Sequence, residues 1–142
     1  MGKVKWNKEV VSIAILVIYV VATLCITLFK REPLDYDSIR TEWFWGYRMD
    51  NPKALYGDNL INILLYIPVG CLVGLIAPKH KILAAVLVGL FLSETIECSQ
   101  LIWHRGTFDV DDLFNNTVGA LVGGLIVVMT LWIWKKGKNS HV

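Results

Sequence analysis

Four long apolar stretches constrain the fold of this chain more than any other feature of its sequence. Residues 10–29, 59–77 and 113–134 contain no Asp, Glu, Lys or Arg, and residues 82–103 contain only Glu94 and Glu97. A helix needs about 20 apolar residues to cross the hydrocarbon core of a bilayer. The sequence therefore predicts an all-α integral membrane protein in which one domain, residues 1–142, forms a bundle of four transmembrane helices.

The positions of the basic residues predict the orientation of this bundle. Residues 1–9, 78–81 and 135–142 contain eight of the 14 Lys and Arg residues. Because Lys and Arg accumulate on the cytoplasmic side of a membrane, we expect both termini to be cytoplasmic and the other two loops to be external. The net charge of +2 provides no basic surface for nucleic acid, so we expect no nucleic-acid partner.

The long external loop contains an aromatic segment, residues 41–49, which reads TEWFWGYRM. Aromatic rings beside arginines are typical of the headgroup region, where an apolar ring and a polar tip are both satisfied. We expect an amphipathic segment that lies on the outer surface and anchors the loop. As an alternative, the same segment helps to hold a lipid or another amphiphile.

Small residues recur every four positions in three of the four spans, a spacing that lets helix backbones approach closely. In the third span the next position of this series is Glu97, so we expect Glu97 to face protein. An ionisable group inside a membrane costs at least ~2.5 kcal/mol on insertion scales, which favours a defined role for Glu94 and Glu97. The small residues are Gly70 and Gly74, then Ala85, Gly89 and Ser93, then Gly119 and Gly123.

The predicted topology brings many polar side chains to the outer half of the membrane. We expect Arg105 to reach Glu97 or Asp109, and Asp111 or Asp112 to cap the fourth helix. Glu97, Asp109 and Arg105 are the candidate catalytic residues, because a buried carboxylate with a raised pKa can act as an acid or base. The candidate substrate-binding residues are Asn62, Tyr66, Glu94, Gln100, Asp112, Asn115 and Asn116.

Three runs of this sequence resemble the VanZ-like family: NILLYIPVG at 62–70, SETIECSQ at 93–100 and RGTFDVDDLFNNTVG at 105–119. In the family pattern a glutamate falls on Glu97, an arginine on Arg105, aspartates on Asp109 and Asp112, and an asparagine on Asn116. The resemblance covers about residues 60–126. It implies a multi-pass protein of the bacterial cell membrane that is associated with resistance to teicoplanin and related lipoglycopeptides.

Three functions are compatible with these observations, and the sequence does not decide whether the protein is an enzyme. The first is a site that binds or modifies an envelope lipid or a lipid-linked peptidoglycan precursor, with Arg105 holding an anionic headgroup. The second is a non-catalytic binding, shielding or partner protein with a structural polar cluster. The third, a small transporter or flippase, is disfavoured because no inverted repeat and no inner polar path are visible.

The same residues leave the ligands and the assembly state open. The sequence identifies no cofactor, and no spacing is diagnostic of a metal site. In a metal-assisted alternative, Glu97, Asp109 and Asp112 recruit Mg²⁺ or Ca²⁺, with His104 as a further candidate ligand, because carboxylate and asparagine oxygens suit such hard cations. The expected partners are membrane lipids, with a lipid-linked peptidoglycan precursor or a lipoglycopeptide as further candidates, and an oligomer is compatible with the pattern.

Overall fold

The structure is a computed structural model that describes residues 7–29, 33–36, 38–48, 57 and 59–139. It confirms four long helices, α1 (Lys8–Phe29), α3 (Leu60–Ile76), α4 (Lys81–Ile102) and α5 (Val110–Asn139). A single-turn helix, α2 (Trp45–Arg48), and two short strands, β1 (Ser38–Arg40) and β2 (Thr107–Asp109), complete the described elements. Helix α5 differs most from its expected span, residues 113–134, since it begins at residue 110 and ends at residue 139.

Three of the helices, α1, α4 and α5, are long and apolar enough to cross a membrane. Helix α3 is shorter, with 17 residues, which at 1.5 Å per residue gives a length of about 26 Å. Large apolar side chains lie exposed along the helices, for example Ile18 on α1, Phe91 on α4 and Trp132 on α5. An exposed apolar surface of this extent is what lipid tails would cover.

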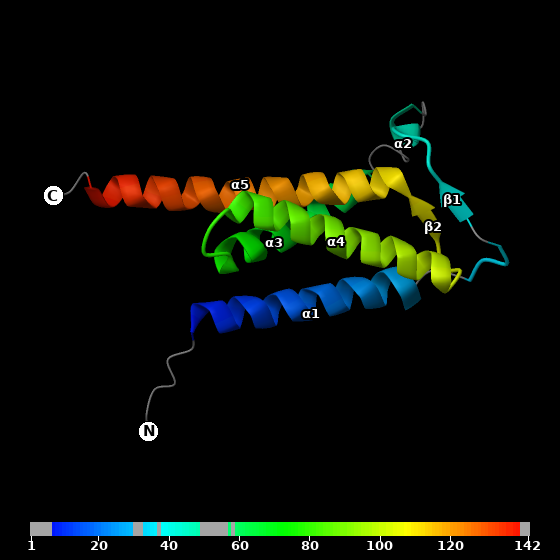
Figure 1. Cartoon of the computed structure of the whole chain (residues 1–142), viewed down its shortest axis with the longest axis horizontal. Helices are drawn as coiled ribbons and strands as arrows, with labels where there is room; N and C mark the ends of the chain where they lie inside the picture. Colours follow the sequence, from blue (N-terminus) through cyan, green and yellow to red (C-terminus); the bar gives the residue numbers. More distant parts are fainter. Residues whose placement is uncertain (1–6, 30–32, 37, 49–56, 58, 140–142) are drawn as a thin grey trace, which may run out of the picture.

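The long helices run side by side, and the two ends of the bundle differ (Figure 1). The start of α1 and the end of α5 lie at one end, whereas β1, β2 and α2 lie at the other. Helix α3 makes its most extensive contacts with α5, and α5 also packs on α4. The apolar core lies where these three helices meet, around Tyr66, Ala85 and Ala120.

Close packing of α3 on α5 confirms the prediction made from the small residues. A Cβ atom built on Gly119 would lie 2.2 Å from the carbonyl oxygen of Ile63, and one built on Gly123 would lie 2.2 Å from that of Ile67. Only glycine allows the two backbones to come this close.

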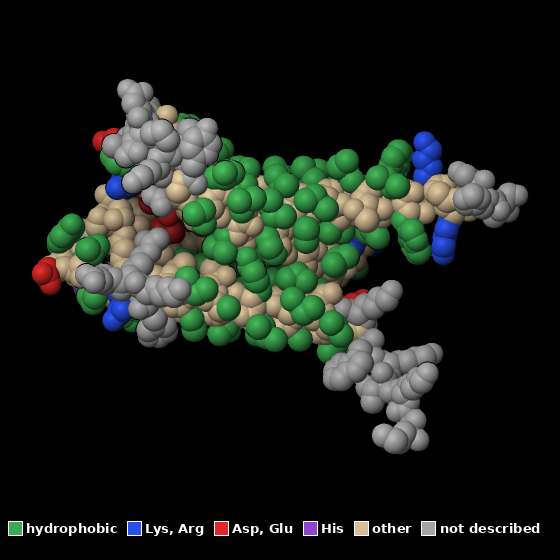
Figure 2. Space-filling view, turned by 180° about the vertical axis from the view of Figure 1, so that it is seen from behind, with side chains coloured by type: hydrophobic (Ala, Val, Ile, Leu, Met, Phe, Trp, Pro, Cys, Tyr) green, Lys and Arg blue, Asp and Glu red, His purple; other side chains and the backbone are tan. Residues whose placement is uncertain are grey.

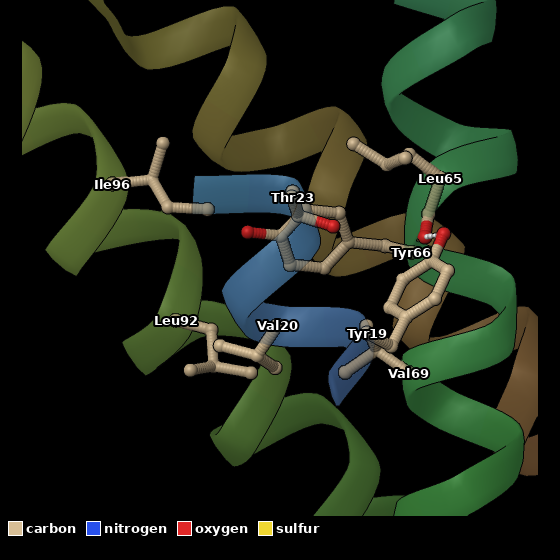
Figure 3. A pocket seen from close by; sticks show the side chains of 8 residues that line it. All are labelled: Tyr19, Val20, Thr23, Leu65, Tyr66, Val69, Leu92 and Ile96. Atoms are coloured by element: carbon tan, nitrogen blue, oxygen red, sulfur yellow. Dashed lines mark hydrogen bonds between the residues drawn. The ribbon is translucent and has the colours of Figure 1, made fainter. Parts of the chain in front are cut away.

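Helix α1 is held less firmly, by a few contacts with α3 and α4. The Tyr19 hydroxyl donates a hydrogen bond to the backbone oxygen of Leu65 at 2.8 Å, and Thr23 is buried. A small apolar pocket lies between α1, α3 and α4, and Figure 3 shows the Tyr66 ring among the side chains that line it.

The two strands are an addition to the expected all-α fold. They pair in parallel, with Ser38 opposite Thr107, Ile39 opposite Phe108 and Arg40 opposite Asp109. The side chains of Ser38 and Thr107 are also hydrogen-bonded, at 2.8 Å. Three residues are too few for an alternating pattern to be visible in a sequence, and each strand exists only because the other supplies its backbone partners.

Candidate functional site

A cleft of about 600 Å³ opens at the end of the bundle that carries the strands. Figure 2 shows acidic side chains set back in a hollow at this end. One part of its lining is polar, and the other part is formed by apolar residues of α1 and α3. Polar groups are supplied by Arg40, Asn59, Asn62, Thr107, Asp109, Asp111 and Asp112, and the remaining lining by Ile26, Thr27, Trp45, Gly57, Ile61 and Leu65.

The strand pairing creates an ion pair in this cleft between Arg40 and Asp109. The register places the two residues opposite each other, and the Arg40 Nη1 atom lies 2.8 Å from the Asp109 Oδ2 atom. The Arg40 guanidinium also lies over the Trp45 ring, 4.0 Å from its centroid, which adds a cation–π contact. The contact of Arg105 with Glu97 or Asp109 stays a prediction. The structure places Arg105 half-buried after α4, where its backbone N–H donates to the Gln100 carbonyl at 2.8 Å.

Asp109, rather than Asp111 or Asp112, caps helix α5. Its Oδ1 atom accepts a hydrogen bond from the backbone N–H of Asp111 at 2.9 Å, which satisfies one of the unpaired donors at a helix start. The prediction that Asp111 or Asp112 is the cap is therefore wrong, because both residues lie within the first turn. The earlier cap moves the start of the helix to Val110.

The two remaining aspartates join α5 to other parts of the chain. Asp111, which is 2% exposed, accepts a hydrogen bond from the backbone N–H of Phe44 at 2.6 Å. Asp112 accepts one from the Asn62 side-chain amide of α3 at 2.6 Å. Both carboxylates also lie near the N-terminus of α5, where the helix dipole favours negative charge.

Tyr47, Asn115 and Asn59 form a relay of side-chain hydrogen bonds from α2 to the start of α3. The Tyr47 hydroxyl donates to Asn115 Oδ1 at 2.5 Å, and Asn115 Nδ2 donates to Asn59 Oδ1 at 2.9 Å. Both asparagines are buried. Burial, followed by the negative charge of Asp111, raises the pKa of Tyr47 above its usual value of 10, so the phenol stays neutral and remains a donor.

The aromatic segment is attached to the bundle through these contacts. The Phe44 and Phe114 rings meet edge to face with their centroids 5.5 Å apart. Trp43 is exposed beside them. Anchoring of this segment at the outer membrane surface stays a prediction, and its last residue, Met49, lies outside the described part of the chain.

Glu97 and Gln100 lie deeper, on the face of α4 that points into the protein. The 2% exposure of Glu97 confirms that it faces protein, and its Oε2 atom accepts a hydrogen bond from the Asp109 backbone N–H at 3.0 Å. Gln100 is buried to a similar degree. Asn116 joins α5 to α4 below this level, since its Nδ2 atom donates to the Ser93 hydroxyl at 2.8 Å. The structure thus connects α4 and α5 to the cap residue by buried hydrogen bonds.

Two candidate residues lie outside this cluster. Tyr66 is buried, but it lies in the apolar pocket between α1, α3 and α4 (Figure 3). Glu94 is exposed on α4. Among the residues that the structure describes, no three His, Cys, Asp or Glu side chains are grouped so that they could hold a metal ion.

Several residues of the site could not be identified from the sequence, because their partners lie far away along the chain. Arg40, Phe44 and Tyr47 each contact residues that lie 67 to 69 positions later. The one available signal was the aromatic composition of residues 41–49, with Arg40 just before the segment and Arg48 near its end. That composition marks the segment as unusual but does not identify its partners.

The fold and this cleft define a class: a helical membrane protein with a buried polar network at one end of its bundle. The chain belongs to the VanZ/LLP1 family, whose sequence model matches residues 16–133 and therefore includes every residue of the cleft. It is 29% identical over 120 residues to Protein VanZ of Enterococcus faecium, an alignment that covers 81% of this chain and 72% of that relative. No solved structure matches the chain.

Proposed function

We propose that this cleft holds the polar headgroup of an envelope lipid or of a lipid-linked precursor, and that this binding underlies a role in resistance to teicoplanin-type antibiotics. The mixed lining of the cleft is the observation that carries the proposal. Arg40, Asn59 and Asp112 supply charges and hydrogen-bonding groups, whereas Ile26 and Ile61 supply apolar surface next to them. Only a ligand with a polar and an apolar part uses both surfaces.

The position of the cleft favours a ligand that stays in the bilayer. Its apolar residues belong to α1 and α3, and Ile26 and Ile61 are also exposed on the outer surface of the bundle. A headgroup bound to the aspartates can therefore leave its tails between these two helices, in contact with lipid. A soluble, fully polar ligand would gain no binding free energy from this apolar side.

The orientation of the bundle belongs to the same proposal. The first residues of α1 and the last residues of α5 lie at one end, and the cleft lies at the other (Figure 1). Because the Lys-rich ends of the chain are expected in the cytoplasm, the cleft would face outwards. An outward site is where an envelope precursor and a lipoglycopeptide would meet the protein.

Binding is better supported than catalysis by the contacts of the carboxylates. Asp109 already caps α5 and pairs with Arg40, and Glu97 accepts the backbone N–H of Asp109. Groups with these structural contacts are suited to fix the shape of the site. We therefore assign Glu97 and Asp109 as positioning residues, with Arg40, Asn59 and Asp112 as the groups that meet the ligand.

A pair of substitutions on α3 tests this proposal. Ile61 and Leu64 are similarly exposed, at 57% and 56%, but only Ile61 lines the cleft. We expect Ile61→Trp to fill the cleft and Leu64→Trp to leave it open. Native mass spectrometry of the full chain, purified from membranes in a mild detergent, should show a retained amphiphile with the wild type and Leu64→Trp. Equal retention by Ile61→Trp would refute binding in the cleft.

A second experiment connects the site to resistance. We expect Glu97→Gln to abolish any teicoplanin resistance of cells that express the protein. The substitution replaces one carboxylate oxygen by an NH₂ group, which adds a buried hydrogen-bond donor next to the Asp109 backbone N–H. We expect the same from Arg105→Ala. Teicoplanin susceptibility and membrane abundance are measured together, so that loss of protein is recognised. Full resistance of both variants at wild-type abundance would show that this network is not the site.

A further inference from the structure

We propose that the cleft selects a zwitterionic headgroup that carries a phosphate and a primary ammonium, as in a phosphatidylethanolamine-type lipid. This inference rests on the proposed function and specifies the chemistry of its ligand.

The charge of the lining disfavours a purely anionic ligand. Among the residues that the structure describes, three aspartates and one arginine line the cleft, which gives these four side chains a formal charge of −2. The arginine, Arg40, already lies 2.8 Å from one of these carboxylates, that of Asp109. A headgroup with only a phosphate would add negative charge to this surface, whereas an ammonium group would offset it.

A buried amide without a partner points to an acceptor in the ligand. Asn59 lines the cleft, is 4% exposed, and its Nδ2 atom has no hydrogen-bond partner within the described part of the chain. Its other amide atom, Oδ1, is occupied by Asn115 Nδ2 at 2.9 Å. A buried donor without a partner is costly, and a phosphate oxygen of a ligand would satisfy it.

Arg40 can assist the same phosphate without leaving Asp109. Its guanidinium has five N–H groups, of which one Nη1 bond is directed to Asp109. Contact with the Trp45 ring holds the guanidinium in place, and the side chain is 37% exposed. The remaining N–H groups can therefore reach a ligand.

Asp112 is suited to receive the ammonium. Its Oδ1 atom accepts the Asn62 amide, which fixes the plane of the carboxylate. A carboxylate has about four acceptor positions on its two oxygens, and a primary ammonium has three N–H donors. Asn59, at the phosphate position, lies at the start of α3, and Asn62, which binds Asp112 at the ammonium position, lies one turn later. The two positions are therefore close together in the cleft.

The apolar side of the cleft identifies a lipid as the source of this headgroup. Ile26 and Thr27 of α1 face Ile61 and Leu65 of α3 around the same cavity. These residues offer nothing to soluble phosphoethanolamine, but they provide apolar surface for the first carbons of the tails. The lipid is therefore expected to bind with its headgroup between Arg40 and Asp112.

The test uses the full chain in nanodiscs that contain equal amounts of phosphatidylethanolamine and phosphatidylglycerol with identical tails. After transfer to a mild detergent, native mass spectrometry measures the ratio of the two retained lipids. We expect the wild type to retain phosphatidylethanolamine over phosphatidylglycerol about tenfold, corresponding to about 1.4 kcal/mol. A retained ratio equal to that of the nanodisc would overturn the headgroup assignment.

Two variants separate the assignment from general effects of charge and folding. Asp112→Asn keeps the shape of the side chain and an acceptor for Asn62 but removes the negative charge, so we expect the preference to fall to about twofold or less. Glu42→Gln removes an exposed carboxylate of the same loop region that does not line the cleft, and we expect the wild-type preference. An unchanged preference in Asp112→Asn would contradict the ammonium site.

The same experiment distinguishes failure of the inference from failure of the proposed function. If the wild type retains neither lipid, the cleft does not hold lipid headgroups and both proposals fall. If lipid is retained, and lost in Ile61→Trp, but without preference, only the headgroup assignment falls. Displacement of the lipid by equimolar soluble phosphoethanolamine would show that the tails contribute nothing and would overturn the lipid source.

Discussion

The substitution Gly119→Ala tests whether the close approach of α3 and α5 sets the geometry of the cleft. The added methyl group would lie 2.2 Å from the Ile63 carbonyl oxygen and 2.9 Å from Tyr66 Cβ. The first of these atoms belongs to the backbone, so no side-chain rotation can relieve the contact. The two helices must move apart instead.

The size of this movement follows from the structure. Relief from 2.2 Å to the 3.4 Å of ordinary contact requires a separation of about 1.2 Å. The hydrogen bond between Asn115 and Asn59, one turn from Gly119, joins the same two helices at 2.9 Å. A shift of this size would lengthen it to about 4 Å, beyond hydrogen-bonding distance. Overpacking of about 2 kcal/mol and the lost bond of about 1 kcal/mol predict a destabilisation of about 3 kcal/mol.

The assay compares unfolding free energy in detergent micelles with lipid retention by native mass spectrometry. Gly137→Ala is the matched control, because nothing lies within 4 Å of its added methyl group and alanine is the better helix former. Gly74→Ala is an intermediate case, with Val127 Cβ at 3.3 Å. We expect Gly119→Ala to lose both stability and lipid, and Gly137→Ala to lose neither. A Gly119→Ala protein with wild-type stability and retention would refute the reasoning.

Three further predictions concern the contacts of residues 40–47 and the orientation of the bundle. Because burial raises the pKa of Tyr47, the folded state favours the neutral form of the phenol. The stabilisation from this group is therefore present below about pH 10, the pKa of an unburied tyrosine, and is lost as the pH rises through the pKa of the folded state. Tryptophan fluorescence against pH should show this alkaline loss in the wild type but not in Tyr47→Phe. A double-mutant cycle of Arg40→Ala and Asp109→Ala should give a coupling of about 0.5 to 1 kcal/mol, because the Arg40 side chain is 37% exposed; a coupling near zero would show that the pair does not stabilise the fold. A fluorescent protein fused at the C-terminus should fluoresce and alkaline phosphatase there should be inactive, whereas the reverse would exclude cytoplasmic termini.

The features that depend on local pattern could be predicted from the sequence. Helix existence follows from the long apolar runs. The burial of Glu97 follows from its place four residues after Ser93 in a series of small residues, which confirms that such a series marks a packed face. The close α3–α5 contact at Gly119 and Gly123 has the same origin. In each case the information lies within one or two turns of helix.

The features that depend on the meeting of distant segments could not be predicted in this way. The pairing of Arg40 with Asp109 requires two three-residue strands that have no pattern of their own. The relay from Tyr47 to Asn115 requires α2 to dock on α5. The start of α5 was misplaced for a related reason. Any of three neighbouring aspartates could supply the cap, and the tertiary contacts of Asp111 and Asp112 leave Asp109 as the one that does so.

The two walls of the cleft are held with different firmness, which predicts where a lipid enters. The polar wall includes residues of α3 and α5, whose backbones are in contact, and a hydrogen bond between buried amides joins Asn59, at the start of α3, to Asn115 of α5. The α1 wall is attached by fewer contacts, among them the hydrogen bond from Tyr19 to Leu65, a residue that itself lines the cleft. Lipid exchange should therefore require movement of α1, while the headgroup contacts stay in place.

The substitution Tyr19→Phe tests this difference, because it removes one hydroxyl at a distance from the headgroup. A hydrogen bond of this kind contributes about 1 kcal/mol, so lipid exchange should become about fivefold faster if α1 must detach for entry. The preference between headgroups should stay unchanged, since Asn59 and Asp112 are untouched. Exchange of a fluorescent lipid between nanodiscs and the reconstituted chain measures the rate, and competition measures the preference. An unchanged rate with an altered preference would show that α1 acts on the headgroup site itself, contrary to the separation of the two walls seen in the structure.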